Sequence, residues 1–136
     1  MSARHKRLED ANAVLLAISR HGRRFFYSSE YDRVSQFEMD IRNHLWLRDK
    51  WTGKRVNLKR QGRWRHFSDG GTLRSLCEAL IGYIRTGEPI SPKWFGPWPE
   101  WVCNGDLWGY GEAMNALRAE LPGLRAVALK THEGKQ

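Results

Sequence analysis

The chain has 136 residues and a formal net charge of +8, from 23 Lys and Arg against 15 Asp and Glu. Hydrophobic residues make up 40% of the sequence and charged residues 28%, which excludes a wholly disordered chain. A chain of this length matches one average domain and buries about two-thirds of the surface that its unfolded form exposes. We therefore expect a single domain over residues 1–136.

Neither a membrane span nor a metal site is indicated. The longest unbroken apolar stretch, Ala13–Ile18, is too short to cross a bilayer and lacks the flanks of a signal peptide, so a cytoplasmic location is the default expectation. Cys77 and Cys103 are the only cysteines, and their spacing does not match a zinc site. We expect reduced thiols, no cofactor and no structural metal.

The predicted helices span about residues 6–21, 69–87 and 105–122, where apolar residues recur at helical spacing. Gly22 follows the first helix at a position typical of a C-terminal cap. Asp69 or Thr72 is expected to cap the second helix, and Thr86-Gly87 to end it. The third helix is followed by a polar tail over residues 123–136.

Alternating polar and apolar residues predict strands over residues 23–28, 33–41, 43–49 and 54–59, with a further short strand over 62–67. The turn Lys50-Trp51-Thr52-Gly53 should join the third and fourth strands as a hairpin, with Gly53 at positive φ. The expected fold is α+β: an antiparallel sheet of three to five strands flanked by an N-terminal helix and two C-terminal helices.

The charge excess lies in this strand region. Residues 1–68 hold 16 basic and 7 acidic residues, whereas residues 69–136 hold 7 and 8. In a strand, alternate side chains share a face, so Leu45 and Leu47 should face the helices while Trp46 and Arg48 face outward. The predicted nucleic-acid-binding residues are Arg42, Trp46, Arg48, Lys50, Lys54, Arg55, Lys59, Arg60, Arg63 and Arg65. Another acidic partner, or a solvated outer face that only raises solubility, would explain the same pattern.

A second candidate site precedes the second helix. Ser68, Gly70, Gly71 and Thr72 form a possible anion site, because paired glycines let backbone N–H groups converge at a helix N-terminus. Against this, Asp69 places a negative charge where a phosphate would sit, and the segment lacks the lysine of a P-loop. Ordinary turn and capping chemistry accounts for the same residues.

A Pro- and Trp-rich loop is expected over residues 88–104. Its aromatic residues Trp94, Phe95, Trp98 and Trp101 could anchor a protein partner, since exposed aromatic side chains dominate interface energetics. The structural alternative is a loop folded back over the core, with its rings filling a satellite cluster.

Catalytic signatures are weak, and we expect a non-catalytic protein. The five histidines are scattered, Cys77 lies on an apolar helical stripe, and Cys103 has no basic neighbour in sequence. Glu38 and Asp40 share a strand face and could bind a metal or act as an acid–base pair. Carboxylates at that spacing also pair with cross-strand Arg or Lys.

The motifs Arg24–Tyr27, Arg63–Ser68 with Gly70–Leu73, and Tyr83–Gly87 resemble a group of small uncharacterised proteins of bacterial chromosomes, plasmids and phages. The resemblance covers about residues 23–90 and implies a shared fold and a mobile-element origin. It supplies no functional residues.

From the residues and this resemblance we expect a small basic binding protein that contacts nucleic acid or a nucleoprotein complex through its basic hairpin. The alternative is an anti-defence inhibitor, similar to anti-CRISPR proteins, that docks on a host protein through the aromatic loop. No membrane partner is expected, and the sequence leaves the oligomeric state open.

Overall fold

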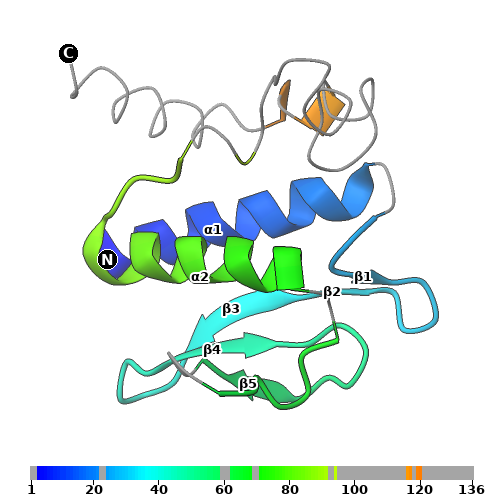
Figure 1. Ribbon diagram of the computed structural model, residues 1–136, viewed down its shortest axis with the longest axis horizontal. Helices are drawn as coiled ribbons and strands as arrows, with labels where there is room; N and C mark the ends of the chain where they lie inside the picture. Colours follow the sequence, from blue (N-terminus) through cyan, green and yellow to red (C-terminus); the bar gives the residue numbers. More distant parts are fainter. Residues whose placement is uncertain are drawn as a thin grey trace.

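The computed structural model describes residues 3–21, 24–58, 62–68, 71–91, 94, 116, 117, 119 and 120. Its helices and strands follow one another as α1 (Ala3–Arg20), β1 (Tyr27–Ser28), β2 (Arg33–Val34), β3 (Gln36–Met39), β4 (Leu45–Arg48), β5 (Arg55–Asn57) and α2 (Gly71–Thr86). Figure 1 shows α1 and α2 side by side on one face of the β3–β4–β5 sheet. The fold is α+β, as the sequence predicts.

Both helices turn their apolar stripes toward a shared core. α1 buries Leu15 and Ile18, and α2 buries Leu76, Leu80 and Ile84, which belong to the same cluster as residues from all three strands of the larger sheet. At the end of α2, Gly87 adopts a φ of 78° and its N–H donates a hydrogen bond of 2.8 Å to the carbonyl of Tyr83. A residue in the left-handed region at this position stops the helix, so the predicted end at Thr86-Gly87 is confirmed.

Two polar contacts join the helices across the length of the sequence. The guanidinium of Arg7 donates to the carbonyl of Ile84 at 3.0 Å, and the hydroxyl of Tyr83 donates to the carboxylate of Asp10 at 2.7 Å. Burial, together with the hydrogen bond to Asp10, raises the pKa of Tyr83 to about 12. α1 and α2 are therefore tied by specific polar groups in addition to apolar packing.

The larger sheet is an antiparallel meander in the order β3–β4–β5. Phe37 pairs with Leu47 and Leu47 with Val56, and all three side chains are buried beneath the helices. Gly53 adopts a φ of 67° in the turn between β4 and β5. The predicted hairpin and its positive-φ glycine are thus confirmed.

The prediction of one continuous sheet is only partly correct, because the described strands form two sheets: β1 and β2 pair apart from the other three. Arg24 and Phe26 have φ values of 56° and 64°, so the predicted strand over 23–28 shortens to its last two residues. The predicted strand over 33–41 is divided at Ser35, because β2 pairs with β1 whereas β3 pairs with β4. The N–H of Ser35 donates to the carbonyl of Phe26 at 2.8 Å.

The predicted strand over 62–67 is wrong. Residues 62–68 contain turns and no strand, and His66 has a φ of 74°, which is incompatible with extended backbone. This segment instead links β5 to α2 with Trp64 buried and packed edge-to-face on Phe67 at 5.4 Å between ring centroids.

Most of the predicted third helix lies outside the described residues. Its described part includes Leu117, whose buried side chain joins the main core cluster. Within the part of the chain that the structure describes, neither helix combines the length and apolar character needed to cross a membrane.

Candidate nucleic-acid interface

The outward face of the larger sheet carries the polar half of the strand pattern. Leu45 and Leu47 are buried against the helices, whereas Trp46 and Arg48 point to the opposite side and are half-buried there. On β5, Arg55 is exposed on this outward face beside β4. Since both helices lie on the other side of the sheet, no described helix or strand covers this face (Figure 1).

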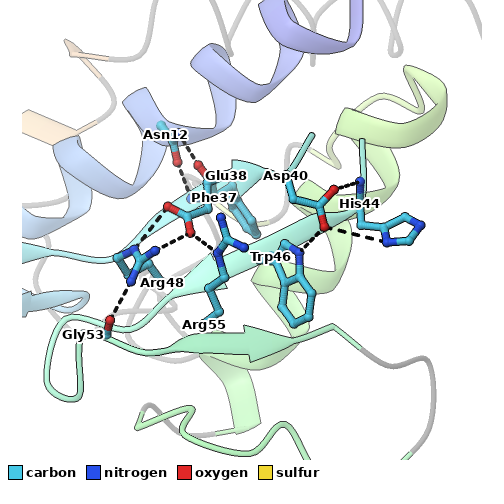
Figure 2. Close-up of polar contacts among 9 residues, drawn as sticks. All are labelled: Asn12, Phe37, Glu38, Asp40, His44, Trp46, Arg48, Gly53 and Arg55. Atoms are coloured by element: carbon cyan, nitrogen blue, oxygen red, sulfur yellow. Dashed lines mark hydrogen bonds and ion pairs between the residues drawn. The ribbon is translucent and has the colours of Figure 1, made fainter. Parts of the chain in front are cut away.

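Glu38 lies on the edge strand β3 and binds two guanidinium groups on this face (Figure 2). Arg48 donates from Nε at 3.2 Å and from Nη2 at 2.8 Å, a two-pronged pairing, and Arg55 donates from Nε at 2.6 Å. Partial burial raises the pKa of Glu38, but the hydrogen bonds from Arg48 and Arg55 outweigh it and lower that pKa overall. One carboxylate therefore connects all three strands.

Arg48 and Arg55 differ in how many guanidinium N–H groups remain available to bind a partner. Arg48 also donates from Nη1 to the carbonyl of Gly53 at 2.7 Å, so each of its guanidinium nitrogens holds a protein acceptor. Arg55 uses only Nε among the described residues, and its guanidinium lies 5.7 Å from the ring centroid of Trp46. Arg48 thus stabilises the hairpin, whereas neither Nη group of Arg55 has a partner in the described part of the chain.

Asp40 organises the turn between β3 and β4. Its carboxylate accepts hydrogen bonds from the Trp46 indole at 3.1 Å and from the backbone N–H groups of His44 at 2.9 Å and Arg42 at 2.8 Å. The indole hydrogen bond and the two backbone donors lower the pKa of Asp40 to about 2. The turn is therefore held by an ionised carboxylate, and Asn43 completes it with a φ of 63°.

The alternative of a metal or acid–base pair at Glu38 and Asp40 finds no support in this geometry. Both carboxylates are engaged by N–H donors, and the prediction that they would instead pair with cross-strand arginines is confirmed for Glu38. Among the described residues no group of three His, Cys, Asp or Glu side chains could hold a metal ion. Cys77 is buried in α2, as expected for a core residue.

Four predicted basic residues are exposed and have no side-chain partner among the described residues: Arg42, Lys54, Arg63 and Arg65. Arg42 follows the end of β3 and Lys54 precedes β5, so they lie in the turns at opposite ends of the hairpin. Arg63 and Arg65 lie in the segment between β5 and α2. No described residue occupies the hydrogen-bond donors of these four side chains.

Lys50 does not share the outward face, contrary to the prediction. Its side chain is only 3% exposed, and its Nζ donates to the Ser68 hydroxyl at 2.9 Å. β4 ends at Arg48, where the chain enters the turn. Beyond that residue the two-residue repeat of a strand no longer predicts on which face a side chain lies. A buried lysine cannot contact a phosphate without rearrangement, and we omit it from the interface.

The possible anion site is only partly assembled. Ser68 donates its hydroxyl to Asp49 at 2.8 Å and accepts from Lys50, so its side chain is already used. Gly71 begins α2 and Thr72 is exposed, whereas Gly70 lies outside the described residues. The described part favours turn chemistry over a phosphate cradle.

Other predicted site residues also lie outside the described residues: Lys59, Arg60, Phe95, Trp98 and Trp101. Trp94 is described, and its half-buried side chain packs against the core cluster. For this one residue the structural alternative, a ring folded onto the core, is favoured.

One exposed aromatic pair was not predicted from the sequence. Tyr31 and Trp51, from two different turns, meet edge-to-face at 6.1 Å and remain 50% and 46% exposed. The Arg33 guanidinium lies 5.2 Å from the Tyr31 ring centroid. The spacing of these residues in the sequence does not predict the contact, because it forms only when the β1–β2 turn and the β4–β5 turn lie next to each other in the fold.

A family model described as YoqU matches residues 2–116. The chain belongs to the YoqU family. The match includes both described helices and every described strand, and extends beyond the segment that carries the resemblance noted in the sequence. No curated protein and no solved structure matches the chain. The family description names no activity, ligand or partner, so the function must be argued from the surface itself.

Proposed function

We propose that the protein binds nucleic acid through the outward face of the β3–β4–β5 sheet and its bordering turns. We call this the basic surface, and it comprises Arg42, Trp46, Arg48, Lys54, Arg55, Arg63 and Arg65. The observation that supports it is the uncovered outward face of the sheet, which carries Arg48 and Arg55 against Glu38. The turns at the two ends of β4 add the exposed Arg42 and Lys54, and the segment after β5 adds Arg63 and Arg65.

The cations that have no partner among the described residues are the ones available to attract phosphates. Each Lys or Arg that neutralises a phosphate releases condensed counterions, and this release drives association at low salt. Arg42 lies at one end of β4, whereas Lys54 and Arg55 lie at the other, so these cations could contact phosphates along one backbone. We therefore assign phosphate contacts to the free cations and not to Arg48.

The network around Glu38 supports the proposal in a second way. A guanidinium held by a neighbouring carboxylate loses less rotamer freedom when it meets a ligand, so part of the ordering cost is already met in the free protein. Arg55 is held through Nε at 2.6 Å, and its Nη groups have no acceptor among the described residues. It is therefore a pre-positioned phosphate donor.

The test is fluorescence anisotropy with labelled single- and double-stranded DNA and RNA across a salt series. Lys54→Ala combined with Arg65→Ala should weaken binding and reduce the salt slope by about 1.4 for single strands, since each lost phosphate contact contributes about 0.7. Lys6→Ala combined with Arg20→Ala is the matched control: it removes the same charge from exposed positions on α1 and should leave the slope unchanged.

Two outcomes would contradict the proposal: no binding at low salt, or equal loss of affinity in both double variants. Equal loss would mean that total charge, and not this surface, determines binding. Absence of binding would favour the second hypothesis, an anti-defence inhibitor that docks on a host protein through the Trp-rich loop. Salt-tolerant binding to a protein, lost on Trp98→Ala, would then be the expected result.

A further inference from the structure

A hollow of about 330 Å³ opens at one end of the larger sheet. It lies where the turn between β3 and β4 meets the start of α1 and the end of α2, which Figure 1 shows on the same side of the molecule. Trp46 belongs both to its lining and to the basic surface, so the hollow is continuous with that surface. Its volume is at the lower end of the range of small-molecule sites.

The lining has the composition of a site for a flat, polar, anionic ligand. Leu45, Leu58 and Ile84 provide an apolar floor and are themselves at most 8% exposed. The side-chain amides of Asn43 and Asn57 lie at the rim, both exposed and without hydrogen-bond partners among the described residues. Small-molecule pockets usually combine an apolar lining with a few polar groups at fixed positions, and such a lining suits a heteroaromatic ring.

The charge of the hollow is positive. Arg4 from α1 and Arg85 from α2 both line it, and neither guanidinium is held by another described residue. No Asp or Glu belongs to the described lining, and the nearby Asp40 carboxylate is occupied by the Trp46 indole and the turn N–H groups. Two unpaired guanidinium groups beside an apolar floor complement a phosphate joined to a base.

We propose that this hollow binds one nucleoside monophosphate unit, with the base against the apolar floor and the phosphate between Arg4 and Arg85. The inference rests on the proposed function, because it assigns the hollow to one unpaired nucleotide of a strand that lies on the basic surface. In a duplex the base is stacked and paired, so a site of this kind selects single strands. A free nucleotide has the same chemistry, and the experiment distinguishes the two sources.

The experiment is an NMR titration of the ¹⁵N-labelled full chain. The probes are the four nucleoside monophosphates, the corresponding nucleosides, inorganic phosphate and an oligodeoxythymidine. Monophosphates should shift the side-chain amide signals of Asn43 and Asn57 at concentrations where nucleosides or phosphate alone do not. Arg85→Ala should weaken monophosphate binding by roughly tenfold, the effect of losing one charged hydrogen bond. Lys6→Ala, which removes an equal charge from α1 outside the hollow, should not.

Competition between oligodeoxythymidine and the monophosphate for the same amide signals would identify the strand as the source and support both proposals. Monophosphate binding without oligonucleotide binding would support the hollow as a free-nucleotide site and overturn the proposed function. Oligonucleotide binding that leaves the Asn43 and Asn57 signals and the Arg85→Ala affinity unchanged would overturn this inference and leave the basic surface in place.

Discussion

The buried carboxylate of Asp49 accepts a hydrogen bond of 2.8 Å from the hydroxyl of Ser68, 19 positions further along the chain. The same carboxylate accepts from the backbone N–H groups of Ser68 at 3.2 Å, Trp51 at 2.9 Å and Thr52 at 3.1 Å. A single side chain therefore shapes the β4–β5 turn and joins it to the segment that leads into α2. It is the only acidic residue between positions 42 and 65.

Asp49→Ala should lower the free energy of unfolding by about 3 kcal/mol, because it leaves several N–H and O–H donors without their acceptor in a buried setting. Urea denaturation followed by circular dichroism would measure the loss. Glu30→Ala, at an exposed carboxylate without described partners, is the control and should change stability by less than about 0.5 kcal/mol. Similar values for the two variants would show that Asp49 does not organise the turn.

Asn12 on α1 acts as a partner for the edge of β3. Its amide donates to the carbonyl of Phe37 at 2.9 Å and accepts from the N–H of Phe37 at 2.7 Å, as Figure 2 shows. Asn12→Ala should cost about 2 kcal/mol, since two part-buried backbone groups lose their partner. Thermal denaturation would measure the loss, and Gln36→Ala, at an exposed position on the same strand, should change the stability little. Equal destabilisation would contradict this role.

Glu38→Gln separates stability from binding. The variant loses two ion pairs of partly exposed side chains and should be destabilised by about 1 kcal/mol or less per pair. It also removes a negative charge from the basic surface, so nucleic-acid affinity at low salt should rise. Glu9→Gln makes the same chemical change at an exposed site on α1 and should not alter affinity. Reduced affinity in Glu38→Gln would mean that ordering of the arginines matters more than added charge.

Asp40 should make folding stability sensitive to strong acid. Its pKa is lowered from 3.8 to about 2 in the folded protein, so its stabilising effect is present above pH 4 and is lost as the pH falls toward 2. Asp40→Asn should therefore show a smaller change in denaturation midpoint between pH 4 and pH 2 than the wild-type chain does. An identical change in both proteins would exclude Asp40 as an acid-sensitive group.

Sequence periodicity predicted the elements whose packing is regular. The stripe that includes Leu76, Leu80 and Ile84 gave α2, and the alternation of Leu45 and Leu47 with polar neighbours gave the correct inward face of β4. These patterns succeed because burial on one face imposes a fixed repeat on the sequence.

The remaining structure depends on groups that are distant in sequence or on unusual backbone. Arg24 and Phe26 adopt positive φ although neither is glycine, so no local signal marks the break in the first predicted strand. The sequence predicts that Arg48 contacts a phosphate, whereas in the structure it pairs with Glu38. This pairing depends on the register of β3 and β4, which composition does not reveal. Lys50 was misplaced because the turn interrupts the two-residue repeat.

The strand order also has a consequence for how the chain folds. Each described strand pairs only with the strand next to it in sequence, whereas Arg7 reaches Ile84 across 77 positions. Loop-closure entropy favours short-range pairing first, so we expect the hairpins to form before α1 and α2 meet. Arg7→Ala should then speed unfolding and leave the folding rate almost unchanged. The docking of α2 is, on this view, the late step that closes the core beneath an already formed sheet.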